Sequence, residues 1–367
     1  RHNIIHPGSL RLRLRPGRRS ASDGKYFNII YYICKMLYKV KEVASKKDLK
    51  RFIRFPESLY KGCSQYVPPL RKGQEKELMH SPSLEYCKRK MWLAEDESGE
   101  VVGRICAMIS TRYNEKYGTR RVRFGWFDLI DDVRVGKLLI EAAESWAKSC
   151  GMEEIHGPLS YNTLGRQGML VEGFDKLAPF SCLYNYPYYV DMMKELGFEK
   201  ECDWIQYMMP ADQGVDEKMK AIASRLMDRH KLRVADFDAL KKDRDMVRRF
   251  FRTYNECYDG NVYNFVPFTD AEIEGEIDEI VGQLDSRLCC VLLDEDDEVA
   301  AFGIAIPSLS KAMQKAGGSL FPFGWYHVLK AKEDFEYLDL MLEGAAPKWQ
   351  NTGISAVFHG MMAQQFE

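Results

Sequence analysis

The sequence lacks the patterns that mark metal-binding, disulfide-rich and membrane-spanning proteins. Its ten cysteines are scattered and form no Cys-x-x-Cys pair. Neither a zinc site nor a disulfide framework is therefore expected, and a reducing cytoplasm suits the chain best. No apolar stretch is long enough to span a bilayer. We expect a cytoplasmic protein with no bound metal and no membrane partner.

Positive charge is also scarce over most of the chain. Residues 1–35 carry a net charge of +7, which leaves −8 for residues 36–367 because the whole chain has a net charge of −1. An acidic body lacks the basic surface with which proteins bind the phosphates of nucleic acids. We therefore expect no nucleic-acid partner.

The first 35 residues have the composition of a leader. They are rich in arginine and poor in acidic residues, as transit peptides are. The alternative, which we favour, is an extension upstream of a natural start at Met36. We expect residues 1–35 to be disordered or non-native and to lie outside the fold.

An internal repeat divides the remaining chain, and the whole sequence of 367 residues is long enough for two domains. Residues 91–109 and residues 290–306 each comprise an apolar strand, an acidic turn and a second apolar strand with one glycine, which is typical of a β-hairpin. The two glycines, Gly103 and Gly303, are 200 positions apart. This spacing indicates a tandem duplication.

Each predicted hairpin is followed by a further strand and a helix whose apolar residues share one face. The expected pairs of strand and helix are 122–130 with 133–149 in the first half, and 335–342 with 356–362 in the second. We therefore predict an α/β (α+β) protein with mixed, mostly antiparallel sheets flanked by helices. Its two domains are expected to be residues 36–210 and 211–367.

The turn after the last expected strand has the composition of a phosphate-binding loop. It reads Gln350-Asn351-Thr352-Gly353-Ile354-Ser355. The first free amides of a helix point outward and the helix dipole favours an anion there, while a glycine lets the backbone approach a ligand closely. On its own the pattern is equally well explained by an ordinary turn between a strand and a helix.

This turn, read as Gln-x-x-Gly-x-Ser, resembles the Gln/Arg-x-x-Gly-x-Gly/Ala signature of GNAT acyltransferases, in which the turn grips the pyrophosphate of acetyl-CoA. The order of predicted elements is similar to the GNAT core. Phrases such as Tyr66-Val67-Pro68-Pro69-Leu70 and Gly173-Phe174-Asp175 resemble uncharacterised bacterial proteins with two tandem GNAT domains. The resemblance implies acetyl-CoA or another acyl-CoA as co-substrate. We assign to its site Leu342, Gln350, Asn351, Thr352, Gly353, Ile354 and Ser355.

The chain departs from the family pattern in both halves. In the first domain the turn places Asp131 and Asp132 where a pyrophosphate would lie, so its CoA loop is degenerate. The tyrosine that many family members use as a general acid is Met193 here. In the second domain the sequence stops at Glu367, before the closing strand, helix and strand of the family. We read the chain as a fragment, or as one whose sheet a partner completes, for example in a homodimer.

A GNAT-like mechanism needs a base that takes a proton from the attacking amine. The carboxylates near the expected loop are Glu336, Asp339 and Glu343. We assign the base to Glu343, which directly precedes the loop, and name Asp339 second because a carboxylate in an apolar strand needs a partner. In the alternative interpretation all three are solvated residues at a strand end.

Three functions fit these observations. The leading hypothesis is a CoA-dependent N-acyltransferase that transfers an acetyl or acyl group to the amine of a small molecule or peptide. The second is a non-catalytic tandem-GNAT scaffold or ligand-binding module, which the degenerate first loop favours. The third is a Fem-type aminoacyltransferase, which would need a surface for tRNA that the acidic body lacks.

Overall fold

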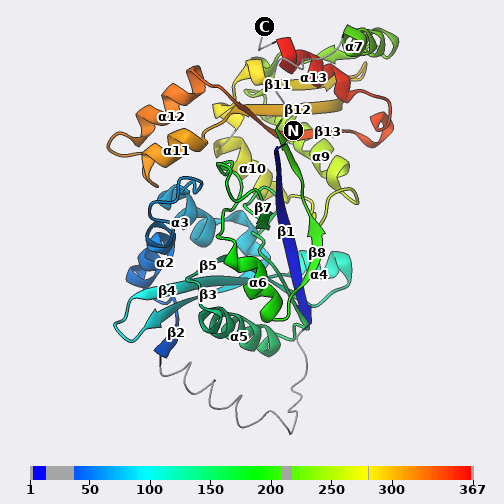
Figure 1. Ribbon diagram of the computed structural model, residues 1–367. Helices are drawn as coiled ribbons and strands as arrows, with labels where there is room; N and C mark the ends of the chain where they lie inside the picture. Colours follow the sequence, from blue (N-terminus) through cyan, green and yellow to red (C-terminus); the bar gives the residue numbers. More distant parts are fainter. Residues whose placement is uncertain (1–2, 14–36, 209–216, 280, 365–367) are drawn as a thin grey trace. The chain divides into compact units, whose positions relative to one another are not determined.

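The computed structural model describes residues 3–13, 37–208, 217–279 and 281–364 (Figure 1). The chain divides into two compact units, of which the first comprises Arg1–Tyr207 and Ser310–Val328 and the second Met208–Leu309 and Leu329–Glu367. The predicted boundary near residue 210 lies outside the described residues.

The first unit contains a large sheet with helices on both of its faces. Its elements in chain order are β1 (Asn3–Arg13), β2 (Tyr38–Glu42), α2 (Lys46–Leu59), α3 (Arg71–His80), β3 (Cys87–Asp96), β4 (Val101–Ser110), α4 (Thr111–Tyr117), β5 (Arg121–Leu129), α5 (Val133–Ser149), β6 (Glu154–Gly157), β7 (Met169–Glu172), α6 (Tyr188–Glu195), β8 (Glu199–Asp203) and β9 (Gln206–Met208). The strand order is β2-β3-β4-β5-β6-β1-β7, and β8 and β9 also pair with β1. Strands β5 and β6 run parallel, whereas β2, β3, β4 and β5 form an antiparallel succession.

Alternation along the central strand β4 distributes its side chains between two cores. Ile105 and Ala107 belong to the cluster that contains α5 and α6, whereas Cys106 and Met108 belong to the cluster that contains α2. Successive residues of a strand point to opposite faces, so both faces of β4 are apolar and covered. Burial of both faces explains why the hairpin was recognisable as a run of apolar residues.

The N-terminal strand β1 corrects the expectation that residues 1–35 lie outside the fold. Residues 3–13 form a strand, and Leu10 to Arg13 pair antiparallel with β6. Leu10 is buried in the first core and Leu12 packs against it. Leucine and arginine alternate along this stretch, which is the period-two pattern of a strand with one buried face. The arginine-rich composition had obscured that pattern.

The second unit has a smaller, fully antiparallel sheet in the order β10-β11-β12-β13. Its elements and the inserted pair α11 and α12 are α7 (Glu217–Arg229), β10 (Arg233–Val234), α8 (Phe237–Leu240), α9 (Arg244–Tyr258), α10 (Asp270–Glu279), β11 (Cys289–Leu293), β12 (Val299–Pro307), α11 (Ser310–Ala316), α12 (Gly324–Glu333), β13 (Leu338–Ala345) and α13 (Ser355–Gln364). Phe302 and Ile304 of β12 face α9 and α10, whereas Ala301 and Ala305 face α13. The predicted class, with mostly antiparallel sheets flanked by helices, is confirmed.

The two glycines of the repeat have the same packing role. A Cβ placed on Gly103 would lie 2.8 Å from Val135 and 2.9 Å from Leu139 of α5. A Cβ placed on Gly303 would lie 2.2 Å from ring carbons of Phe358 of α13. Helix α5, which follows β5, therefore rests on a position of β4 that has no side chain, and α13, which follows β13, rests on such a position of β12.

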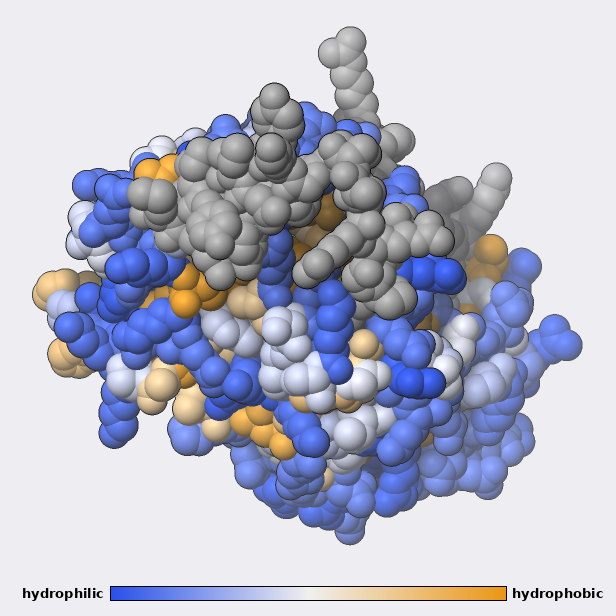
Figure 2. All heavy atoms as spheres, turned by 90° about the horizontal axis from the view of Figure 1, so that it is seen from below, coloured by the Kyte–Doolittle hydropathy of each residue, from blue (hydrophilic) through white to orange (hydrophobic). Residues whose placement is uncertain are grey.

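The face of the molecule shown in Figure 2 is mostly hydrophilic, with hydrophobic residues in small separate areas. Within the described residues, no helix combines the length and the apolar character needed to cross a bilayer.

The contact between Gly303 and Phe358 predicts a sharp response to a single methyl group. We expect Gly303→Ala to destabilise the second unit by about 1–3 kcal/mol, because the methyl group overlaps the ring. The matched control is Gly360→Ala in α13, where a Cβ meets nothing within 4 Å and helix propensity predicts a stabilisation of up to about 1 kcal/mol. Urea unfolding measures both, and equal effects would contradict the proposed contact.

Candidate functional site

Strand β13 is displaced along the sequence from the expected strand 335–342. Pairing with β12 begins at Leu338 and continues to Ala345, opposite Ala301. The Ala346 N–H then donates to the Ala300 carbonyl at 2.9 Å, which extends the ladder to the start of the turn. The sequence had suggested that Glu343 follows the strand. In the structure Glu343 is a residue of β13.

The turn from β13 to α13 contains two residues in the left-handed region, Asn351 with φ of 61° and Gly353 with φ of 81°. The Thr352 hydroxyl donates to the Trp349 carbonyl at 2.6 Å and fixes the middle of the turn. A Cβ on Gly353 would meet only Leu226, at 3.9 Å. The glycine is therefore required by its backbone angle and not by crowding.

Several backbone amides at the start of α13 are available to a ligand. The carbonyls of Gly353 and Ile354 accept from the N–H groups of Ala356 and Val357, both at 3.0 Å. Within the described chain, no acceptor is found for the N–H groups of Gly353, Ile354 and Ser355. Free amides at the positive end of a helix dipole suit an anionic group.

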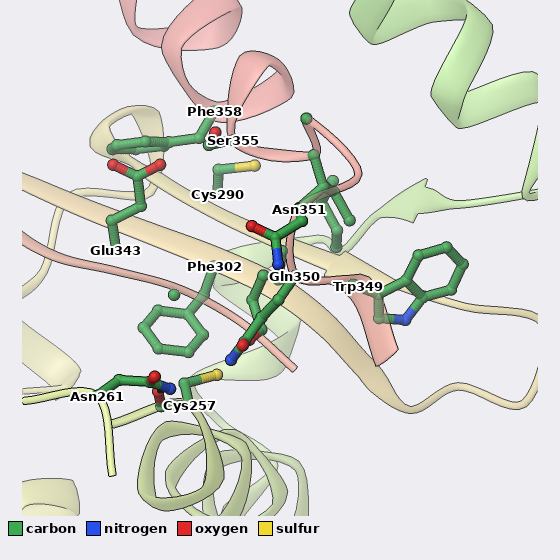
Figure 3. Close-up of a pocket in the computed structure, with 16 residues that line it drawn as sticks. Cys257, Asn261, Cys290, Phe302, Glu343, Trp349, Gln350, Asn351, Ser355 and Phe358 are labelled. Atoms are coloured by element: carbon green, nitrogen blue, oxygen red, sulfur yellow. Dashed lines mark hydrogen bonds between the residues drawn. The ribbon is translucent and has the colours of Figure 1, made fainter. Parts of the chain in front are cut away.

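A cavity of about 660 Å³ opens beside this turn (Figure 3). Strand β13 contributes Glu343 to its wall, the turn contributes Gln350 and α13 contributes Phe358. Cys257 of α9 also lines the cavity. The cavity therefore reaches from the end of the sheet to the start of α13, within the second unit.

The structure brings most of the predicted site residues together around this cavity. Those that line it are Glu343, Gln350, Asn351, Gly353, Ile354 and Ser355. Leu342 instead pairs with Ile304 and packs against the core beneath α9. Thr352 is exposed, with its hydroxyl bonded within the turn.

Asp339, the second predicted base, is not part of the cavity wall. It pairs with Ile306 near the start of β13, away from the turn. Burial raises the pKa of Asp339, and a hydrogen bond from Ser308 opposes that effect. Asp339 is therefore an unusual carboxylate in an apolar strand, and it does not lie beside the cavity.

Glu343 forms an ion pair that the sequence did not reveal. His359 Nε2 lies 3.4 Å from Glu343 Oε2, and the His359 side chain is one-third exposed, at 33%. The hydrogen bond to Glu343 raises the pKa of His359 above its ordinary value, although burial acts in the opposite direction. His359 is not among the residues that line the cavity, and it meets the cavity wall through this ion pair with Glu343.

Two thiols line the cavity but are not prepared for nucleophilic attack. Burial raises the pKa of both Cys257 and Cys290 to about 12. A thiol with such a pKa is almost entirely protonated at neutral pH, and the thiolate is the reactive form. The cavity therefore offers the carboxylate of Glu343, with His359 as its ion-pair partner, and no activated cysteine.

None of the described residues that line the cavity is a lysine or arginine. Lys348 lies nearby in sequence, but its ammonium group pairs with Asp294 at 2.5 Å and lies 5.5 Å from the Trp349 ring centre. An anion in the cavity would therefore meet backbone amides of the turn, and not a fixed cation.

The corresponding turn of the first unit satisfies its own amides. Asp132 caps α5 by accepting from the Arg134 N–H at 2.9 Å, and it also accepts from the Tyr38 hydroxyl at 2.9 Å. Burial alone would raise the pKa of Asp132, but hydrogen bonds from Arg134 and Tyr38 outweigh burial and lower it. The Leu129 N–H at the end of β5 donates to the Tyr189 hydroxyl at 2.8 Å. Met193 lies buried in the first core.

This fold resembles that of a solved acetyltransferase region. The match is to a GCN5-related glucosamine N-acetyltransferase region of a fungal multi-domain GH3 β-N-acetylglucosaminidase. It covers 90% of this chain and 34% of that chain, at 12% sequence identity and a TM-score of 0.50. The chain therefore has a GNAT-like fold.

Comparison with known sequences assigns the chain to a family of proteins. No family model matches the chain. Protein YghO of Escherichia coli K12 is 31% identical over 292 residues, which cover 79% of this chain and 73% of that protein. The chain belongs to the family of Protein YghO. A bacterial ceramide synthase of Caulobacter vibrioides is 28% identical over 295 residues, which cover 78% of this chain and 74% of that protein.

The Glu343–His359 pair predicts a pH-dependent stability. Because the folded-state pKa of His359 is raised, the pair contributes fully below the unfolded pKa and its contribution is lost as the pH rises through the folded pKa. We expect Glu343→Gln to melt below wild type at about pH 6, where histidine is largely protonated, and to approach wild type by about pH 9. Melting curves across this range measure the effect, with His359→Asn as the comparison. A difference independent of pH would contradict the pairing.

Proposed function

We propose that the chain is an N-acyltransferase that transfers an acyl group from a coenzyme A thioester to a primary amine. The observation that carries the proposal is the cavity in which Glu343 and the free amides of Gly353 to Ser355 lie at the two ends of one turn. The amides suit the phosphate groups of the donor. The carboxylate suits the proton of the acceptor.

The chemistry assigned to this cavity balances at Glu343. The amine nitrogen forms a bond to the thioester carbonyl, and the bond from that carbonyl carbon to sulfur then breaks. Glu343 takes the proton that the amine must lose and then gives it to the departing thiolate, which restores the carboxylate. The ion pair with His359 at 3.4 Å holds the Glu343 carboxylate. The protonated thiols of Cys257 and Cys290 favour this direct transfer over an acyl-cysteine intermediate.

The first unit does not serve as a second donor site in this proposal. A ligand phosphate there would meet the carboxylate of Asp132, whose oxygen already accepts the Arg134 amide. Such a phosphate would be repelled by the aspartate and would find its amide already bonded.

A long-chain amino alcohol is the acceptor that we propose to test first. The relative from Caulobacter is named a ceramide synthase, and a ceramide is the N-acylated form of such an amine. Its identity of 28% extends over 78% of this chain. An aminoacyl-tRNA donor is disfavoured because the body of the chain carries a net charge of −8.

Donor binding depends on the turn at Gly353. We expect acyl-CoA to raise the melting temperature of wild type, by mass action equivalent to about 2.7 kcal/mol at one hundred times Kd. Gly353→Glu should abolish that shift, because the new carboxylate repels the phosphates and the backbone angle of 81° disfavours a side chain. Gly99→Glu is the matched control, because Gly99 also has φ of 81°, in a hairpin turn of the first unit. Loss of the shift in both variants, or in neither, would refute the site.

Proton transfer depends on Glu343 and His359. We expect Glu343→Gln to lower kcat by roughly 100-fold or more with little change in the KM for acyl-CoA, since general bases contribute about 100- to 10,000-fold. His359→Asn should act in the same direction, and the double variant should add little because the two act as one unit. Steady-state kinetics with an amine panel tests this. Full activity of Glu343→Gln would exclude it as the base.

A further inference from the structure

A segment of two helices outside the cavity presents an exposed apolar surface. It runs from α11 through a loop into α12, between β12 and β13. The side chains of Phe321 and Phe323 are 83% and 72% exposed, and those of Trp325 and Tyr326 are 47% and 54% exposed. Leu320 is also exposed. We call these five residues the aromatic patch. Aromatic side chains gathered this way normally mark an interaction surface.

Hydrogen bonds within the loop hold the segment that carries the aromatic patch, so the exposure of its side chains does not reflect a loose segment. The Ser319 hydroxyl donates to the Phe321 carbonyl at 2.9 Å, and the backbone N–H of Trp325 donates to the Leu320 carbonyl at 2.8 Å. A Cβ on Gly324 would lie 2.1 Å from the Ser319 carbonyl oxygen. The loop therefore folds back tightly on itself and turns its aromatic residues outward.

Contacts from the rest of the first unit fix the base of the loop. The Arg71 N–H donates to the Gly318 carbonyl at 3.0 Å, and the Arg71 guanidinium donates to the Gly317 carbonyl at 2.9 Å. The Gln314 amide donates to the Ser64 carbonyl at 2.8 Å. The backbone polar groups are thus used for anchoring, and the apolar side chains are left at the surface.

The charge around the aromatic patch is positive, although most of the chain is acidic. The segment from α11 to the end of α12, residues 310–333, contains four lysines and one acidic residue, Glu333, which is a net charge of +3. The lysines are Lys311 and Lys315 of α11, and Lys330 and Lys332 in the last turn of α12. Glu57, whose carboxylate approaches Gly318, is ion-paired with Arg71. A surface that binds another protein can carry charges of either sign. Lysines beside Phe, Trp and Tyr are the combination that suits anionic lipid headgroups above the acyl chains.

We propose that the segment of α11 and α12 docks the protein on the surface of an anionic phospholipid bilayer, with the aromatic patch inserted at the level of the headgroups. The lysines would contact the lipid phosphates. The expectation of no membrane partner came from the absence of a spanning stretch, which concerns crossing a bilayer and not resting on one. This inference stands apart from the proposed acyl transfer, because docking requires no turnover.

Vesicle sedimentation of the whole chain tests the proposal without any activity measurement. We expect wild type to sediment with vesicles of phosphatidylcholine and phosphatidylglycerol, and much less with phosphatidylcholine alone. The double variant Phe321→Ser/Phe323→Ser should lose binding more than ten-fold. Lys315→Gln/Lys330→Gln should lose roughly five-fold for each lysine, and only on anionic vesicles. Added salt should weaken wild-type binding.

The matched control is Ile205→Ser/Tyr207→Ser, which removes two exposed apolar residues elsewhere, 47% and 65% exposed. It should bind like wild type, and all variants should melt like wild type because the changed side chains are at the surface. Wild type that stays in solution with anionic vesicles overturns the proposal, as does an unchanged patch variant. Light scattering provides the other decisive outcome. A wild-type dimer that the patch variant converts to a monomer, with no vesicle binding, would assign the patch to self-association.

Discussion

The contact between a helix and a bare position on a central strand is the constraint on which both units depend. Gly103 and Gly303 leave room for α5 and α13 to lie close to their sheets. In the second unit this contact puts Phe358 on β12, and it thereby fixes the first turn of α13 next to the end of β13. The free amides of the turn and the carboxylate of Glu343 face one cavity because that helix cannot move outward without leaving a void under Phe358.

Much of this arrangement was predictable from local pattern. Both hairpins, the helices that follow them and the role of Gly353 follow from apolar periodicity and from the needs of a tight turn. The start of β13 was missed by three residues because Phe335 and Tyr337 are as apolar as the strand itself, and only pairing with β12 decides the boundary. His359 was missed because a single histidine in a helix has no meaning until the partner carboxylate is placed. The tandem origin of the two halves stays a prediction that the shared glycine contact supports.

In the proposed function, backbone amides and no lysine or arginine of the described cavity wall would bind the anion, which has physical consequences for the site. Backbone dipoles are fixed by the turn, so they do not reorganise when a ligand arrives. They also carry no net charge that dissolved salt could screen at long range, which makes recognition depend on shape. Burial keeps the two thiols of the cavity protonated, while the carboxylate of Glu343 in its wall is paired with His359. In the proposed function, one part of the site would bind the donor and another would transfer protons.

In the first unit, the hydroxyl of Tyr189 and the carboxylate of Asp132 accept hydrogen bonds from the amides that an outside ligand would need. Removing Tyr189 alone would take the partner from a buried N–H group, and removing Asp132 alone would take it from a half-buried one, and each change would still leave the other in place. A variant in which only one of the two side chains is replaced is therefore expected to be less stable and still to bind no ligand in this unit. Changes there are strongly interdependent, and a designer would have to make them together.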